Sequence, residues 1–419
     1  MRSEIILTAA AALAATAAGF EAAPTFQASK LLAPKLLKGP HHTIAEPVKA
    51  EGYYQEFHIV STFGEMDAEG RTVLATRLAE VDALARLSEV SKSEVFVKAA
   101  GGAVLNVGKG VAMVVKDPGA TAEGIGKGVK RFGTNLGRKA KRGAESATTD
   151  DKKPDDASKT EADKAAEAST SAANSVLGVN SSARRWAQKL SVDPYTTNPV
   201  LHKALVDIGK IDAAGGIAAK VVVPIPMVVS TTATVGGLVW GKDPEELRKI
   251  NEKAVADLGA SKDVAARFFR NGNYTLTNQT RFIAALGAVK VKGCADYVDA
   301  AAEAGDEREA LFFVESAELL AGLHKTSPVT AILEDSRGMI ARTGPRAEVL
   351  LPFDYLRWTQ PLEKAVIEIA ERAKKELGAT TLGIRLVGKA SEAARKGLAE
   401  SGWQVKEGVA EGLGTQPAD

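Results

Sequence analysis

A stretch near the middle of the chain constrains the fold most, because it cannot contribute to a hydrophobic core. Residues 143–175 contain no apolar residue larger than alanine, and Ser, Thr, Asp, Lys and Glu dominate them. A segment of this composition buries too little apolar surface to offset the conformational entropy lost on folding. We therefore predict a disordered linker here, with folded parts of the chain on both sides.

The chain as a whole has the composition of a globular protein. Its 419 residues are 45% hydrophobic and 25% charged, which suits two or three folded parts. Only 5% are aromatic, while alanine and glycine are abundant, and this argues against the aromatic-lined pocket of a small-molecule enzyme. The net charge of +2 gives no general attraction to nucleic acid or anionic lipid, so a function that depends on charge must be local.

The N-terminus has the pattern of an export signal. A charged start precedes an uncharged run over residues 5–18, and the small residues Ala15 and Ala17 form a cleavage site. We predict a signal peptide over residues 1–17 and export to the periplasm or the cell envelope; a short membrane anchor or an alanine-rich disordered leader are the alternatives. Cys294 is the only cysteine, which excludes an intramolecular disulfide and a cysteine zinc site.

The first folded part begins after the predicted signal. Residues 18–49 mix Pro, Lys and His with short apolar stretches, which predicts an irregular lead-in. The β-forming residues 53–63 predict one strand, and apolar side chains at helical spacing predict a helix over residues 68–90. Together with the basic helices described next, they make up a region over residues 50–142.

A glycine-rich basic segment is the most distinctive part of the sequence. Residues 91–142 hold eleven Lys or Arg residues against three acidic ones, which leaves a local net charge of +8. Asp117-Pro118-Gly119 divides the segment into two helical pieces. Pairs of glycines four residues apart would let these helices pack closely while the cationic side chains face outward. The predicted binding residues are Lys98, Lys109, Lys116, Lys127, Lys130, Arg131, Arg138, Lys139, Lys141 and Arg142.

These residues predict contact with an anionic surface. Each Lys or Arg near an anionic bilayer contributes about 1 kcal/mol before screening, so the cluster suffices to hold a peripheral protein at a membrane. An anionic envelope polymer, or nucleic acid without sequence specificity, are further partners of the same charge. The alternative is that the segment binds no partner and forms a helical hairpin whose lysine side chains are only solvated. The linker carries a net charge of −4 over residues 145–167, either as a plain solvated linker or as a tethered counter-charge for the basic helices.

Residues 176–327 predict an all-α region. Asn198, followed by proline, has the residue type of a helix N-cap, and Asp243 begins another helix in the same way. Residues 221–241 carry no charge for 21 positions, but prolines near their start make them a poor membrane span. We interpret them as a buried loop and helix. Their pairing with the apolar residues 99–115 in a pore-forming, membrane-inserting protein is an alternative.

The character of the sequence changes in residues 328–408. Alternating strands and helices predict a small α/β sheet domain that opens with a hairpin, followed by a disordered tail over residues 409–419. The expected strands cover residues 329–333, 339–341, 349–353, 381–387 and 403–406, and the expected helices cover residues 361–377 and 391–402. The whole chain is therefore predicted to be an α+β protein, predominantly helical in its N-terminal and middle regions.

No motif in the sequence identifies a reaction or a cofactor. The glycines around Lys127 lack the spacing of a phosphate-binding loop, and no nucleophile elbow or histidine–glutamate zinc motif occurs. The five histidines have no partner at metal-binding spacing. The acidic pairs Asp296 with Asp299, and Glu315 with Glu318, have the spacing of a solvated helix face. We therefore predict no cofactor and no metal site.

One polar cluster is the basis for an enzymatic alternative. Glu334, Asp335 and Arg337 at the predicted hairpin, with Asp354 and Arg357 after the next strand, are expected to meet at one sheet edge. Our leading hypothesis is a non-enzymatic exported protein that binds an anionic surface, chiefly a membrane, through the basic helices. A hydrolase with its site in the C-terminal domain is the alternative. The sequence does not indicate an oligomeric state.

Overall fold

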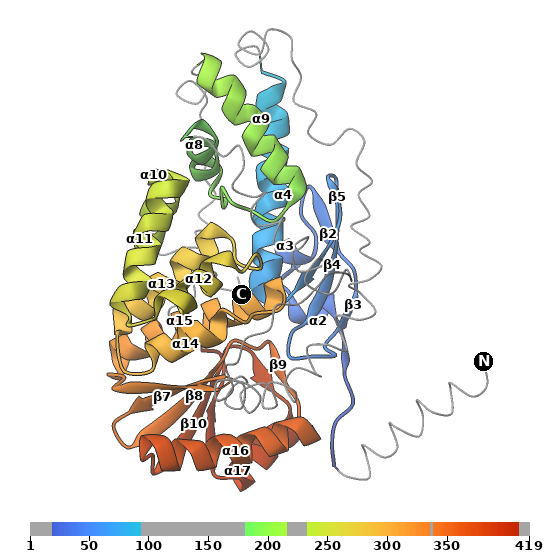
Figure 1. Cartoon of the computed structure of the whole chain (residues 1–419). Coiled ribbons are helices and arrows are strands. Elements are labelled where there is room, and N and C mark those ends of the chain that lie inside the picture. Colours follow the sequence, from blue (N-terminus) through green and yellow to red (C-terminus); the bar gives the residue numbers. More distant parts are fainter. Residues whose placement is uncertain (1–18, 94–180, 216–232, 336–337, 410–419) are drawn as a thin grey trace, which may run out of the picture.

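The computed structural model describes residues 19–93, 181–215, 233–335 and 338–409. Within these residues the chain has the α+β fold that its sequence predicts. Figure 1 shows a helical centre with one sheet at its lower end and a second sheet along one side. Two long helices extend from the centre to the opposite end of the molecule.

The N-terminal sheet is antiparallel and packs against the helix that follows it. Its strands and the two one-turn helices beside them are β1 (Thr25–Gln27), α2 (Ala28–Leu31), α3 (Pro34–Leu37), β2 (His42–Ile44), β3 (Pro47–Lys49), β4 (Glu56–Ser61) and β5 (Gly64–Glu69). Helix α4 (Arg71–Ser91) buries Leu74 and Leu78 against Phe57 and Ile59 of β4. This packing forms a small core of its own.

One sequence prediction for this part is wrong, and one strand was missed. Residues 18–49 are not an irregular lead-in, because they supply three strands of the sheet. The single strand expected over residues 53–63 is confirmed as β4, but the sequence did not predict β5, which pairs with it from Glu56↔Glu69 to Ser61↔Gly64. Strands of three residues are too short to show alternation, and β5 is rich in acidic residues that disfavour strands. Only pairing with segments elsewhere in the chain defines these strands.

A second small core lies between α4 and the next two helices of the described chain, α8 (Ser181–Leu190) and α9 (Pro199–Gly215). Leu84 of α4 packs with Trp186 of α8 and Leu205 of α9. Asn198 caps α9 as predicted, because its Oδ1 accepts two backbone N–H groups from the first turn. Figure 1 shows that α4 and α9 finish at the same end of the molecule.

In its described part, the middle region predicted to be all-α consists of helices. They are α8, α9, α10 (Ala233–Gly241), α11 (Pro244–Asp257), α12 (Lys262–Arg270), α13 (Leu276–Val289), α14 (Cys294–Ala301) and α15 (Glu307–Thr326). Asp243 caps α11 as predicted, accepting the N–H group of Glu246 at 2.9 Å. The aromatic rings of Phe268, Tyr274 and Phe282 meet between α12 and α13, with Phe268 5.0 Å and 5.2 Å from the other two ring centroids. None of the described helices combines the length and the apolar character of a membrane span.

The C-terminal sheet has five strands in the order β12-β10-β8-β7-β6. Strands β6, β7 and β8 are antiparallel neighbours, while β8, β10 and β12 are parallel. The elements of this part are β6 (Ala331–Asp335), β7 (Gly338–Thr343), β8 (Arg346–Leu351), β9 (Tyr355–Leu356), α16 (Gln360–Leu377), β10 (Thr381–Leu386), β11 (Lys389–Ala390), α17 (Glu392–Glu400) and β12 (Trp403–Lys406). The predicted hairpin, three further strands and two helices are confirmed.

The C-terminal sheet and the middle helices share one hydrophobic core. Figure 1 places α14 and α15 on one side of this sheet and α16 and α17 on the other. Buried residues of both parts, such as Leu320 of α15 and Leu350 of β8, belong to the same apolar cluster. The change of pattern near residue 328 therefore marks a change of secondary structure and not a boundary between two cores. Local periodicity does not reveal whether two segments share a core.

Candidate functional site

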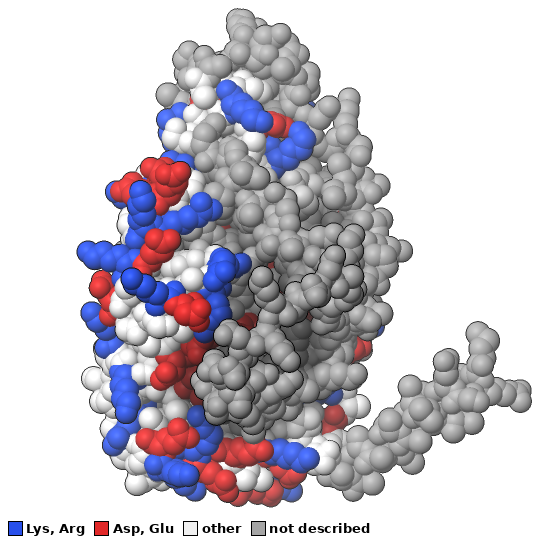
Figure 2. Space-filling view, in the orientation of Figure 1, with Lys and Arg blue, Asp and Glu red and all other residues white. Residues whose placement is uncertain are grey.

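The ten cationic residues predicted to bind an anionic surface lie outside the described residues, within the range 94–180. Most of the uncharged stretch 221–241 also lies outside them, up to residue 232. On the face drawn in Figure 2, the described Lys and Arg side chains are interspersed with Asp and Glu. The described part of this face therefore presents a mixed surface rather than one of a single charge.

The polar cluster expected at the C-terminal sheet edge has a different role. Asp354 is buried, and its Oδ2 accepts the backbone N–H groups of Gln55 at 2.9 Å and Arg71 at 3.2 Å. Burial raises the pKa of this carboxyl from 3.8 to about 6. Arg357 donates to two backbone carbonyl groups of the N-terminal part, and Arg337 lies outside the described residues. Asp354 and Arg357 thus fasten the N-terminal elements to the sheet.

The histidines give no sign of a metal centre in the described parts of the chain. His58 Nδ1 lies 2.7 Å from Asp67 Oδ1 on the neighbouring strand, and both side chains are exposed. Across residues 19–93, 181–215, 233–335 and 338–409, no group of three or more His, Cys, Asp or Glu could hold a metal ion.

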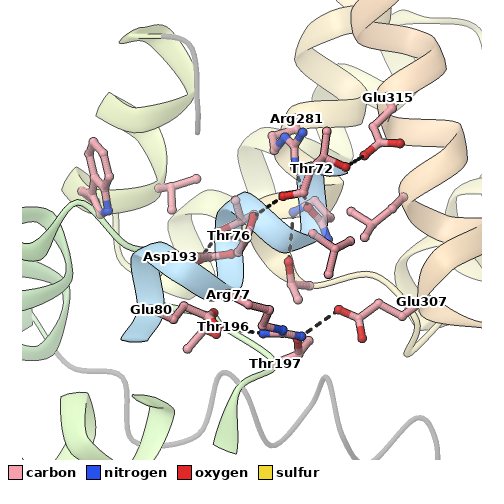
Figure 3. Close-up of a pocket in the computed structure, with 17 residues that line it drawn as sticks. Thr72, Thr76, Arg77, Glu80, Asp193, Thr196, Thr197, Arg281, Glu307 and Glu315 are labelled. Carbon is pink, nitrogen blue, oxygen red and sulfur yellow. Dashed lines mark hydrogen bonds and ion pairs between the residues drawn. The ribbon is translucent and has the colours of Figure 1, made fainter. Parts of the chain in front are cut away.

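The described structure contains a cavity of about 80 Å³, which we call the polar cavity because most of its lining residues are polar (Figure 3). It lies where α4 meets α13, α15 and the segment that precedes α9, with α10 closing one side. The chain thus brings five segments together around it that are far apart in the sequence. The polar side chains labelled in Figure 3 are Thr72, Thr76, Arg77, Glu80, Asp193, Thr196, Thr197, Arg281, Glu307 and Glu315.

Glu80 of α4 organises one wall of the cavity. Its side chain is buried, and its Oε2 accepts Nη1 of Arg77 at 2.9 Å and the amide of Asn198 at 3.1 Å. Its Oε1 accepts the hydroxyl group of Thr196. Arg77 also donates to the hydroxyl group of Thr197 at 2.9 Å. These bonds hold the start of α9 against α4 through charge-assisted contacts.

Two further buried ion pairs lie on the side of α13 and α15, and each contributes one residue to the lining, Arg281 and Glu315. Arg281 of α13 binds Glu318 of α15 in a bidentate pair, with N–O distances of 2.8 and 2.9 Å. Arg308 binds Glu315, whose other oxygen accepts the hydroxyl group of Thr72 at 2.6 Å. Glu315 and Glu318 are 2% and 5% exposed. The expectation that this acidic pair forms a solvated helix face is wrong, because α4 and α13 cover the face with guanidinium and hydroxyl groups.

Asp193 and Glu307 complete the lining. Asp193 Oδ1 accepts the N–H group of Tyr195 at 2.8 Å and the hydroxyl group of Thr277 at 2.5 Å. Burial nevertheless raises its pKa from 3.8 to about 6. Glu307, at the exposed start of α15, accepts the hydroxyl group of Thr197 at 2.9 Å.

Sequence reasoning missed this cavity as a whole. It weighed Glu315 and Glu318 only as a pair on one helix, and used Asp193 only as part of a turn. One available signal was the polar first half of α13, with Thr277 and Arg281 in a helix whose second half is apolar. Comparison with protein-family models, with curated proteins and with solved structures finds no match for the chain.

Proposed function

We propose that the protein is a non-enzymatic exported protein of the periplasm or cell envelope that attaches to an anionic membrane surface through its basic segment, residues 98–142. The local net charge of +8 in a chain whose total is only +2 carries this proposal. Charge concentrated in this way attracts an anionic bilayer, while a surface of mixed charge contributes little.

The position of two helix ends supports a single membrane-facing end. Helix α4 leads the chain toward residue 94, and α9 leads it toward residue 216. Both helices pack in one small core and finish at the same end of the molecule (Figure 1). The chain therefore enters its basic segment from this end of the molecule, which favours contact of this end with a bilayer.

Vesicle co-sedimentation of the full mature chain tests the proposal. We expect binding to vesicles that contain phosphatidylglycerol, weaker binding as salt increases, and little binding to neutral phosphatidylcholine vesicles. Deletion of residues 94–142 leaves α4 intact and should abolish the salt-sensitive binding. Deletion of residues 143–175 is the matched control, since it removes the acidic linker and should preserve or strengthen binding.

Two outcomes would contradict membrane attachment. One is equal partition of the full chain and of the variant without residues 94–142; the other is binding that does not respond to salt or lipid charge. Release of a trapped dye from the same vesicles separates surface attachment from the pore-forming alternative. We expect no release, because attachment through Lys and Arg side chains leaves the bilayer intact.

A further inference from the structure

The polar cavity between α4, α13 and α15 has more carboxylates than cationic partners. Three arginines at or beside it each pair with one glutamate. Asp193 and Glu307 remain, and among the described residues neither has a Lys, Arg or His nitrogen within 4.0 Å. The cavity therefore carries an excess of negative charge.

Asp193, a residue of the cavity lining, also has an unused acceptor. Both hydrogen bonds to its side chain go to Oδ1, and Oδ2 has no hydrogen-bond partner among the described residues. Asp193 is partly buried, and burial raises the pKa of its carboxyl, which disfavours the charged form. A cation inside the cavity would stabilise the charged form.

The other wall residues restrict the kind of cation. Val73, Trp240 and Leu311 contribute apolar surface, and threonine hydroxyl groups contribute acceptors. The acidic residues of the described chain do not form a group able to hold a metal ion. An engineered cavity of ~150 Å³ accepts benzene, so a cavity of about 80 Å³ has room for roughly three non-hydrogen atoms. An organic cation of two or three heavy atoms matches this size and these walls.

We propose that this cavity binds the ammonium group of a small primary amine, with Asp193 as the direct acceptor and Glu307 as the second negative charge. The site is separate from the proposed membrane-binding segment and does not depend on it. Ionised Asp193 accepts the N–H groups, so the amine binds more weakly once this carboxyl is protonated, below about pH 6.

Ethylammonium is the probe that tests the site. The full mature chain is titrated with ethylammonium chloride while sodium chloride keeps the chloride concentration constant, and the thermal midpoint is followed. We expect a saturable rise of the midpoint, since a ligand that binds only the folded chain stabilises it. Tetramethylammonium has the same charge but is larger and has no N–H group, and it should produce no saturable rise.

Two variants and one control locate the binding. Asp193→Asn should weaken ethylammonium binding about tenfold and remove its pH dependence near pH 6, because the variant loses one charge-assisted bond. Glu307→Gln changes an exposed residue and should preserve the fold. We expect a smaller loss of ethylammonium affinity, which depends on salt concentration. The double variant Glu371→Gln/Glu400→Gln removes two exposed charges elsewhere and should bind as the original chain does.

Clear results would overturn the assignment. If ethylammonium gives no saturable rise of the thermal midpoint beyond that seen with sodium, the cavity does not bind the amine. If tetramethylammonium acts equally, the effect is general screening rather than a site. If Asp193→Asn and Glu307→Gln both bind ethylammonium as tightly as the original chain, the amine binds elsewhere. None of these outcomes bears on vesicle binding, so failure here is distinguishable from failure of the membrane proposal.

Discussion

The C-terminal sheet and the junction around the polar cavity are stabilised in opposite ways. In the sheet, apolar side chains such as Leu350, Ile384 and Leu386 are almost fully buried on strands whose pairing is regular. At the junction, α13 and α15 meet through the Arg281–Glu318 pair, and α4 meets α15 through the bond from Thr72 to the buried, ion-paired Glu315. One region depends on many small apolar contributions, and the other on a few strong charged contacts.

The difference predicts how each region responds to damage. Removing part of a buried apolar side chain loses transfer free energy and leaves a cavity, and neighbouring side chains share the loss. Removing one member of a buried ion pair leaves the other charged and desolvated without its bonded counter-charge. A buried ion pair is therefore weak evidence that the pair stabilises the fold on balance. Removing only one of its partners is nevertheless strongly destabilising.

The largest expected effect follows from breaking the Arg281–Glu318 pair. Both side chains are nearly buried, at 10% and 7% exposure, and the contact is bidentate. Glu318→Ala should lower the free energy of unfolding by about 3–5 kcal/mol, because Arg281 then stays buried without its counter-charge. Urea unfolding followed by circular dichroism measures this change.

The double variant Arg281→Met/Glu318→Leu sharpens the comparison. It replaces both charges by apolar groups of similar size, and its free energy of unfolding should lie within about 1 kcal/mol of the original value. A loss for the double variant as large as that for Glu318→Ala would mean that the junction depends on the pair itself. The contrast between the two regions would then fail.

The same contrast explains what the sequence could predict. In the C-terminal part, Pro361 near a helix start, the stop at Gly378 and the Ser391 cap are local signals, and each lies where the structure has that helix end. Regular alternation of apolar residues marks the strands for the same reason. Local chemistry decides these elements, so the sequence alone suffices to find them.

The cavity and the N-terminal sheet could not be found in this way. Glu80 reads as part of a polar helix face, but it is buried because Thr196 and Asn198 arrive from more than a hundred positions away. Likewise, β1 is defined by its pairing with β3, whose register joins Thr25 to Lys49. Contacts of this kind depend on which helices and strands meet, and no local pattern specifies that meeting.

An intermediate effect is expected at Asp354, which fastens the N-terminal elements to the C-terminal sheet. Its folded-state pKa of about 6 exceeds the ordinary 3.8, so the folded chain holds this proton more tightly than the unfolded chain. The contribution of Asp354 to the free energy of unfolding therefore decreases as pH rises from about 4 to about 6, by up to roughly 3 kcal/mol. Asp354→Asn removes this dependence while its amide oxygen still accepts the N–H groups of Gln55 and Arg71.

Unfolding at a series of pH values measures the difference between variant and original chain. The stability of Asp354→Asn relative to the original should improve as pH rises through this window. Asp257→Asn, an exposed substitution with the same change of charge, is the control and should keep the original slope. If Asp354→Asn has that slope too, the carboxyl titrates alike in the folded and unfolded chains, and its burial has no energetic consequence.

The smallest expected effect concerns a helix cap at the sheet. Thr359 is the N-cap of α16, and its Oγ1 accepts the N–H group of Leu362 at 3.3 Å. Thr359→Ala should lower the free energy of unfolding by about 1 kcal/mol, while Thr359→Ser should restore most of it, because the hydroxyl acceptor returns. Urea unfolding measures both. The loss stays small because the buried face of α16, with Leu362, Val366 and Ile369, remains packed on the sheet. A loss of the size expected for Glu318→Ala would contradict the comparison, since the sheet region would then also depend on single polar contacts.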